Sequence, residues 1–311
     1  MKAVSFQENT MEIPSYPSTR EIELQDKSRM DVLFQQMQPR VSELTFANLY
    51  LFRFAHHYKL TLVGDSLVVL GTGYSGDEYF LRPFGGDVEI ALDFLFSEGR
   101  VLSGVDEEFV GKYLKDRHGV EFVEDRDSFD YLYNRHDLAT LSGKRFHKKK
   151  NRARYFTNRH PFTVDRYSDR YYREALDLVE EWRRVHTDID SRSLEPEVAA
   201  AAEGLEKAAQ LGLEGVVILV EGRVQAYALG EKLNSITSLC HFEKAAPFYD
   251  GLYQVVDQEF NRRCFVDCTF VNREQDLGEP SLRKSKLSYH PVELVKKYRS
   301  WKVKTKDSSL L

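Results

Sequence analysis

Apolar residues in the second half of the chain recur with the spacings of helices and strands. A stripe with helical spacing predicts a helix that Ser168 or Asp169 caps and that ends near His186. Pro196 and Gly212 predict the start and the end of an alanine-rich second helix. The next three segments have the composition of strands, and they cover residues 215–222, 223–232 and 235–244.

The rest of the second half alternates in the same way. Pro247 predicts the start of a helix, a strand follows over residues 264–272, and a polar loop leads to a short basic helix over residues 281–289. A last helix is predicted from Pro291 to about Trp301. This order of helices and strands is that of the GNAT acyltransferase fold, and many other α+β domains share it.

The first half mixes the same two kinds of element. Residues 26–38 predict a helix that ends at Pro39. Residues 46–84 have a β-like pattern, in which Gly64 and Asp65 form a hairpin turn. Two helices and a strand complete this half, near residues 89–97, 107–118 and 120–123.

The length of the chain, 311 residues, exceeds what a single core usually supports and suggests two compact units. Hydrophobic residues make up 42% of the chain, which argues against a largely disordered protein. We predict an N-terminal leader, a first domain, a basic inter-domain segment and a second domain, over residues 1–24, 25–140, 141–160 and 161–311.

The net charge of −5 is distributed unevenly along the sequence. Residues 139–170 and residues 283–306 each carry a net charge of +8, so the other residues together carry −21. A mildly acidic protein with two concentrated basic segments is suited to binding a polyanion or a phosphorylated ligand.

Several protein classes lack support in the sequence. No run approaches the roughly 18 apolar residues of a transmembrane helix, and the N-terminus has no apolar signal-peptide core. Cys240, Cys264 and Cys268 do not suggest a disulfide framework or a zinc site, and the motifs of serine hydrolases, dehydrogenases and P-loop enzymes are missing. We therefore expect a cytoplasmic protein with reduced cysteines and no bound metal.

The first basic segment concentrates seven Lys or Arg residues between residues 144 and 154, with aromatic residues among them. Such an array can bind phosphates, and the aromatic residues can stack or anchor the segment. A solvated helix face or a linker is the structural alternative. The candidate binding residues in this segment are Lys144, Lys148, Lys149, Asn151 and Arg152.

The second segment, residues 265–291, places a polar loop between a predicted strand and a basic helix. Ligands favour the carboxyl ends of strands in open α/β sheets, where loops and helix N-termini meet. The carboxylates of this segment could bind an ammonium group, and its cations could bind a phosphate. The structural alternative is a network of helix caps and salt bridges. The candidate binding residues here are Asn272, Arg273, Arg283, Lys284 and Tyr289.

Residues 141–152, LSGKRFHKKKNR, and residues 272–291, NREQDLGEPSLRKSKLSYHP, together resemble the stand-alone bacterial relatives of the C-terminal domain of phosphatidylglycerol lysyltransferase. The resemblance extends over residues 25–300. It implies an α+β fold of two tandem GNAT-like domains, each a mixed and mostly antiparallel sheet flanked by helices. Fem-type transferases, which move an amino acid from aminoacyl-tRNA to an amine or hydroxyl, share this architecture.

The same resemblance carries expectations about residues near the C-terminus. The lipid-modifying relatives have an R-K-x-K pattern followed by an aromatic residue and proline, which supports the donor. The pattern falls here on Arg283, Lys284, Lys286, Tyr289 and Pro291. Those relatives also have a membrane-embedded N-terminal domain, which this sequence does not show.

The resemblance implies the transfer of an activated aminoacyl group to an amine or hydroxyl acceptor, with aminoacyl-tRNA as the expected donor and no cofactor. Residues 241–251 lack the glycine-rich turn that binds acetyl-CoA in GNAT enzymes, although an acyl-CoA-dependent N-acyltransferase and a non-catalytic polyanion-binding protein remain alternatives. The acceptor, a small molecule or a lipid headgroup, and the oligomeric state stay open. The catalytic candidates are Asp267, Glu274, Asp276 and Lys286.

Overall fold

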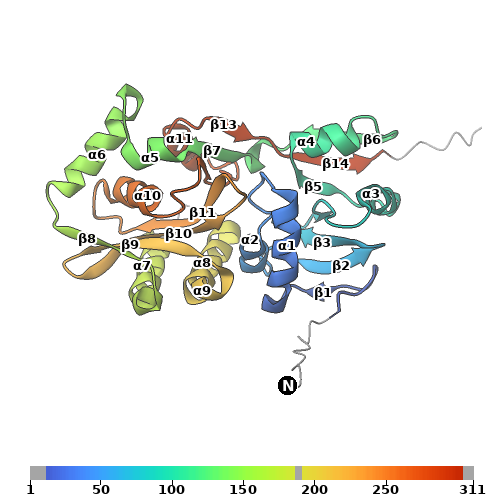
Figure 1. Ribbon diagram of the computed structural model, residues 1–311, viewed down its shortest axis with the longest axis horizontal. Helices are drawn as coiled ribbons and strands as arrows, with labels where there is room; N and C mark the ends of the chain where they lie inside the picture. The colour runs from blue at the N-terminus through green and yellow to red at the C-terminus, as the bar shows by residue number, and fades with distance from the viewer. Residues whose placement is uncertain (1–11, 186–190, 304–311) are drawn as a thin grey trace, which may run out of the picture.

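The computed structural model describes residues 12–185 and 191–303. These residues form two seven-stranded sheets that lie side by side, the first mainly from the N-terminal half and the second mainly from the C-terminal half (Figure 1). Each sheet has one parallel pair of strands, and its other pairs are antiparallel. The structure confirms the predicted fold class of two tandem GNAT-like α+β domains.

The first sheet has the strand order β1-β2-β3-β4-β5-β14-β6. The hairpin predicted at Gly64 and Asp65 joins β2 to β3, where five residue pairs are in antiparallel register. The strands are Arg20–Glu21 (β1), Lys59–Val63 (β2), Ser66–Thr72 (β3), Glu78–Phe80 (β4), Leu102–Val105 (β5), Val120–Glu124 (β6) and Tyr298–Lys302 (β14).

The second sheet has the strand order β13-β7-β12-β11-β10-β9-β8. The predicted three-strand meander forms its long central part, because β9, β10 and β11 pair antiparallel in succession. The strands are Asp130–Asn134 (β7), Phe162–Arg166 (β8), Glu214–Val220 (β9), Arg223–Lys232 (β10), Thr237–Ala245 (β11), Phe270–Asn272 (β12) and Glu293–Val295 (β13).

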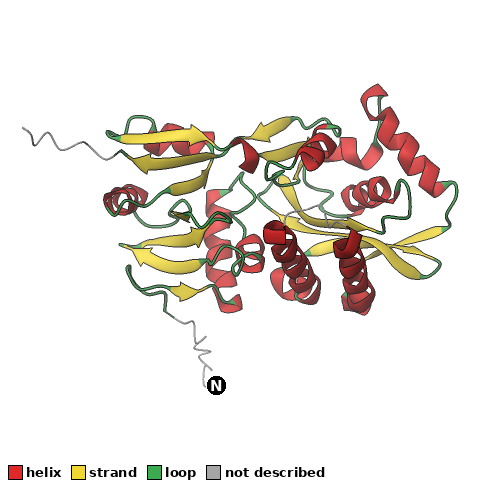
Figure 2. Ribbon diagram, turned by 180° about the vertical axis from the view of Figure 1, so that it is seen from behind, coloured by secondary structure: helices red, strands yellow, loops and turns green. Residues whose placement is uncertain are grey.

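Helices cover both faces of the second sheet (Figures 1 and 2). On one face, α10 (Leu252–Arg263) packs on the central strands, and α5 (Arg135–Thr140) and α6 (His147–Thr157) pack against α10. On the other face, α7 (Tyr172–Val185) packs on β10 and β11 and against α8 (Ser191–Glu206). The remaining α-helices are Lys27–Met37 (α1), Phe46–Leu51 (α2), Val88–Ser97 (α3), Glu107–Phe109 (α4), Ala208–Leu211 (α9) and Pro280–Leu287 (α11).

The two halves of the chain exchange strands. β7 and α5, which span residues 130–140 at the end of the segment assigned to the first domain, belong to the second sheet and its helix layer. In return, β14 near the C-terminus lies between β5 and β6 of the first sheet. The larger buried apolar cluster contains residues from both halves, such as Phe46 and Phe242. The two sheets therefore share a core.

The described part of the predicted leader, residues 12–24, packs on the first sheet. Ile13 is buried, Ser15 bridges to Leu62, and β1 pairs with β2 at the sheet edge. Residues 1–11 lie outside the described residues.

Two predicted elements are wrong. The last helix, predicted from Pro291 to about Trp301, is replaced by strands β13 and β14. Partner strands more than 150 residues earlier override the local preference, because β13 pairs with β7 and β14 pairs with β5 and β6. The start of the β-like run is the helix α2, which Thr45 caps by accepting a hydrogen bond from Asn48 N.

Other boundaries move by a few residues. Pro196 lies inside α8 and does not start it, and α10 begins at Leu252 rather than at Pro247. Only Phe270–Asn272 of the predicted strand over residues 264–272 pairs in the sheet. The predicted end of the helix near His186 lies outside the described residues.

Candidate functional site

The two parallel strands of the second sheet separate where the second sequence motif begins. β11 and β12 pair over three residues, and the last pair joins Leu239 to Asn272. Beyond this point β11 continues to Ala245, whereas Arg273, the residue that follows β12, donates its backbone N–H to Tyr131 O on β7. The side chains around this divergence form the candidate site.

A β-bulge in β11 lies next to the point where β11 and β12 separate. The register against β10 passes from Phe242 directly to Cys240, so His241 is an additional residue without a partner on β10. Bulges redirect side chains and are common beside active sites. Glu274, on the opposite side of the divergence, has a positive φ of 55°, and its backbone N–H donates to the side chain of Asn272.

Arg273 is the centre of a buried ion cluster. Its Nη2 donates to Glu243 Oε2 of β11 at 2.9 Å, and its Nη1 lies 3.2 Å from Asp257 Oδ1 of α10. Nη1 has no hydrogen-bond acceptor and Asp257 Oδ2 has no donor among the described residues. Burial raises the pKa of Glu243 to about 7 and also raises the pKa of Asp257. The cluster therefore combines a carboxyl group that titrates near neutrality with two buried polar atoms that make no hydrogen bond in the described residues.

Lys149 and Tyr289 lie next to this cluster. The Lys149 Nζ is 3.8 Å from the centroid of the Tyr289 ring, and the Arg273 guanidinium is 5.0 Å from the same centroid. Tyr289 is buried, whereas Lys149 is partly buried. Burial, together with the nearby charge of Arg273, lowers the pKa of Lys149 to about 8. The two sequence motifs thus meet at this ring.

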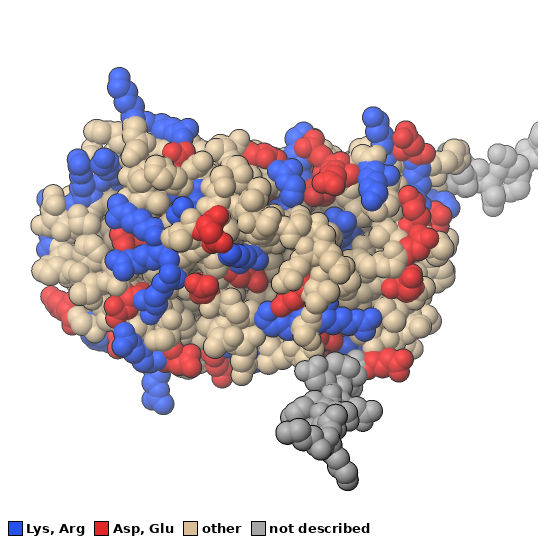
Figure 3. Space-filling model, viewed as in Figure 1, with Lys and Arg blue, Asp and Glu red and all other residues tan. Residues whose placement is uncertain are grey.

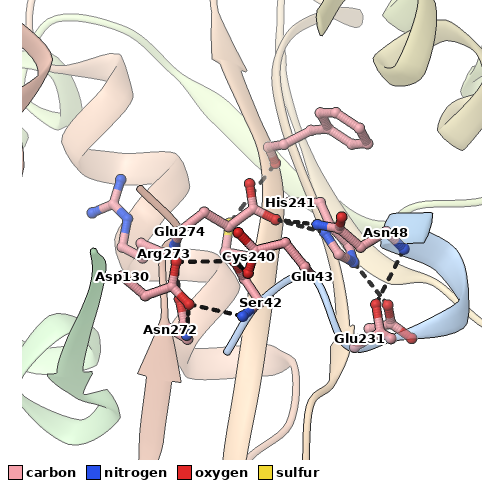
Figure 4. Close-up of polar contacts among 12 residues, drawn as sticks. Ser42, Glu43, Asn48, Asp130, Glu231, Cys240, His241, Asn272, Arg273 and Glu274 are labelled. Atoms are coloured by element: carbon pink, nitrogen blue, oxygen red, sulfur yellow. Dashed lines mark hydrogen bonds and ion pairs between the residues drawn. The ribbon is translucent and has the colours of Figure 1, made fainter. Parts of the chain in front are cut away.

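A second ionic group lies on the other side of the divergence. Figure 4 shows Glu274 and His241 facing one another, while Arg273 points the opposite way. His241 Nδ1 is 2.9 Å from Glu274 Oε1, and Nε2 is 2.8 Å from Glu231 Oε1. Burial alone would lower the pKa of His241, but the two carboxylates outweigh it and raise the pKa to about 10. His241 is therefore a cation that joins β10, β11 and the end of β12.

Lys286 holds the loop that follows β12. Its Nζ donates to the backbone carbonyls of Arg273, Glu274 and Gln275, at 2.5, 3.1 and 2.7 Å. Burial lowers the pKa of Lys286 to about 8. Since an ammonium has three N–H donors, these carbonyls use all of them, and Lys286 orients the loop.

Asp276 and Arg283 form a salt-bridge network beyond this loop. Asp276 is fully buried and accepts hydrogen bonds from Arg283, Tyr131 and the backbone of Gly278. Although burial acts in the opposite direction, these donors lower the pKa of Asp276 to about 2. Arg283 also pairs with Asp127. This carboxylate is saturated by partners, which suits a structural role.

Asn272 connects the site to buried charges between the two sheets. Its side chain donates to Asp130 Oδ2 at 2.9 Å (Figure 4). Asp130 also accepts from Lys297 at 2.7 Å. Lys297, which is fully buried, donates to both carboxylate oxygens of Glu43 as well. Because Ser42 also donates to Asp130, this network ties the first domain to β7 and β12.

The other predicted site residues lie on the surface. Lys144, Lys148, Asn151 and Arg152 are exposed on α6 or just before it. Figure 3 shows Lys and Arg side chains gathered over the end of the molecule where α6 and β8 lie. Lys284 is exposed on α11 and lines a shallow pocket of about 510 Å³.

Asp267 is also exposed, and it pairs with Lys232. It precedes β12, at the opposite end of the strand from Arg273 and Glu274. The structure therefore brings together Lys149, Asn272, Arg273, Glu274, Lys286 and Tyr289, but not Asp267.

Residues 34–300 match the family described as "Phosphatidylglycerol lysyltransferase, C-terminal". The chain belongs to this family. The match includes both sequence motifs and every residue of the site, which confirms the resemblance drawn from those motifs.

The chain is similar in sequence or in structure to several other proteins. A conserved protein of unknown function from Bacteroides thetaiotaomicron is 31% identical, with a TM-score of 0.83 over 92% of this chain and 99% of that chain. FemX, at 11% identity, shares the fold, with a TM-score of 0.56 over 92% of this chain and 97% of its own. An uncharacterised protein of Mycoplasmoides gallisepticum is 26% identical over 203 residues, which span 63% of this chain and 62% of that protein.

Membership in the phosphatidylglycerol lysyltransferase C-terminal family supports an aminoacyl-transferase type of function. In the described part of the chain, no helix combines the length and the apolar character that a membrane crossing requires.

Four charged residues of the site were absent from the sequence prediction: Glu231, His241, Glu243 and Asp257. Glu243 and His241 lie in the mostly buried strand β11, and Asp257 lies on the buried face of α10 beside Val256 and Phe260. An ionisable residue on a predicted apolar face is the signal that identifies such positions, because burying it without a partner is unfavourable.

Proposed function

We propose that this member of the phosphatidylglycerol lysyltransferase C-terminal family moves an aminoacyl group from aminoacyl-tRNA to an amine or hydroxyl acceptor. The observation that carries the proposal is the pair of buried polar atoms without hydrogen-bond partners, Asp257 Oδ2 and Arg273 Nη1. Buried polar groups are usually satisfied, so atoms of this kind in a cluster suit a ligand. The reaction needs no cofactor.

The carboxylate suits the ammonium group that an aminoacyl ester carries. Asp257 is 1% exposed, and one of its two oxygens faces Arg273 while the other has no donor. An ammonium placed at Oδ2 would form a charge-assisted hydrogen bond in a site with little water. This contact would orient the ester carbonyl relative to Glu243.

The transfer itself needs a nucleophile and a proton acceptor. The acceptor nitrogen or oxygen attacks the ester carbonyl carbon, the new bond forms, and the ester C–O bond to the terminal ribose breaks. Glu243 accepts the proton of the attacking group and returns it to the leaving ribose oxygen, which a carboxyl group with a pKa of about 7 can do near neutral pH. Lys286 and His241 act through the loop and the bulge that they hold.

The exposed cations of α6 are proposed to bind the tRNA. Replacing Lys148 or Arg152 with alanine should weaken tRNA binding at low salt and reduce the slope of log K against log salt by about 1 each, since each phosphate contact releases counterions. Filter binding or fluorescence anisotropy over a salt series measures both quantities. Lys115→Ala, an exposed lysine of the first half, is the control. A slope that stays the same in both variants contradicts this placement.

The donor is tested by transfer from tRNA charged in turn with each labelled amino acid, in the presence of small-molecule and lipid fractions. The proposal predicts that label leaves the tRNA and appears in an acceptor, and that the rate falls steeply with salt. Transfer from an acyl-CoA, or binding of tRNA with no transfer under any condition, would reject the proposal in favour of an N-acyltransferase or a binding protein, respectively.

A further inference from the structure

Lys149 carries a positive charge without an ion-pair partner or hydrogen-bond acceptor in residues 12–185 and 191–303. Its neighbours on α6, Lys148 and Arg152, are exposed, whereas Lys149 extends inward to the face of the Tyr289 ring. An aromatic face attracts a cation but accepts none of its three N–H groups as an oxygen would. The ammonium therefore has unused donors at the edge of the site.

A second cation lies at the same ring. Arg273 Nη1 lies 3.2 Å from Asp257 Oδ1 as an ion pair but makes no hydrogen bond among the described residues. The hydroxyl of Tyr289 accepts a hydrogen bond from Gln254 and retains its own hydrogen as a donor. Two cations and a phenol thus lie together, and neither the Lys149 ammonium nor Arg273 Nη1 makes a hydrogen bond among the described residues.

The charges around Lys149 leave an excess of positive charge. The charge of Arg273 is offset by Glu243 and Asp257, which contact it directly. No carboxylate contacts Lys149 itself in the described residues, and the nearby Arg152 adds a further positive charge. An anion beside Lys149 would therefore be attracted by more cations than it is repelled by carboxylates.

We propose that Lys149 and Arg273 bind a phosphate group of a ligand beside the ring of Tyr289. A phosphate offers several oxygens to donors on different residues, which matches an ammonium and a guanidinium that approach one ring. This site extends the proposed function and rests on it for the identity of the ligand. The phosphate would belong either to the terminal nucleotide of the donor tRNA or to the headgroup of the acceptor.

The site predicts a pH dependence of binding. Burial and then Arg273 lower the pKa of Lys149 to about 8, and a bound phosphate dianion would raise it. Above pH 8 the free protein must therefore take up a proton to bind, and the affinity should fall about tenfold for each further pH unit. Glu243, Asp257 and Lys286 also face this region, and Lys286 has a pKa of about 8. Variants of Lys149 separate its titration from theirs.

The experiment measures binding of adenosine 5′-monophosphate, sn-glycerol 3-phosphate and inorganic phosphate to the full chain by calorimetry from pH 7.5 to 9.5. The wild-type affinity should fall as the pH rises. Lys149→Met should weaken binding at pH 7.5 at least tenfold. Lys149→Arg, which keeps a charge that does not titrate here, should retain binding and lose most of the pH dependence. Lys150→Met is the matched control on the same helix and should behave as the wild type.

Two outcomes would overturn the phosphate site: unchanged binding in Lys149→Met, or a wild-type pH dependence in Lys149→Arg. Tighter binding of adenosine 5′-monophosphate or tighter binding of glycerol phosphate would each support the site. The tighter ligand would identify the source of the phosphate. Because these probes carry no aminoacyl group, binding can be retained when transfer from aminoacyl-tRNA is not observed. Failure of the proposed function is thus distinguishable from failure of this site.

Discussion

Replacing Glu243 with glutamine is expected to lower aminoacyl transfer by about 10²- to 10⁴-fold, the usual contribution of a general base. Glutamine keeps the size of the side chain and an oxygen that can accept from Arg273 Nη2, but it cannot take a proton. The fold should therefore be retained while the chemical step is lost. Single-turnover transfer from aminoacyl-tRNA measures this step directly.

The transfer rate should depend on pH in a direction that follows from the pKa of Glu243. Burial raises the pKa of Glu243 to about 7, so the carboxylate needed for proton transfer is present above that pH and disappears below it. The wild-type rate should rise about tenfold per pH unit below pH 7, and the residual rate of Glu243→Gln should lack this rise.

Glu121→Gln, on the exposed edge strand β6 of the other sheet, is the matched control and should transfer at the wild-type rate. Wild-type transfer in Glu243→Gln, or a rate in that variant that still rises through pH 7, would remove Glu243 from the reaction.

The sequence predicts elements whose signals are local. The helix α7 and the β9–β10 hairpin follow from apolar spacing and a tight turn, and the two basic motifs identify the family. The strand β14 cannot be predicted from the local sequence, because it forms only on pairing with β5 and β6, about 180 residues earlier. A strand of this kind is specified by tertiary contacts that no window of the sequence contains.

The same distinction applies to the site. The sequence places Arg273, Glu274 and Lys286 in one motif, and the structure places all three around one loop. The sequence does not distinguish Lys149 from Lys148, because a run of lysines does not indicate which side chain points toward Tyr289. The packing of α6 against α10 determines which lysine points inward.

Replacing His241 with leucine is expected to lower the free energy of unfolding by about 3–5 kcal/mol, the range for breaking a buried ion pair. The His241 side chain is 0% exposed and lies between Glu231 and Glu274. Without the imidazolium, two carboxylates would face an apolar side chain and repel one another. Urea denaturation, with His118→Leu as an exposed-histidine control, measures the loss.

The pH dependence of this loss follows from the proton that His241 holds. Its pKa is raised from the ordinary 6.5 to about 10 in the folded state, so the stabilisation is fully present below pH 6.5 and declines as the pH rises toward 10. The difference in unfolding free energy between wild type and His241→Leu should therefore be largest below pH 6.5 and smaller at each higher pH. A difference that is constant from pH 6 to pH 9.5 would mean that His241 is neutral and that the loss comes from packing alone. Because the bulge at His241 lies two residues from Glu243 on β11, the variant should also lose transfer activity under conditions where it remains folded.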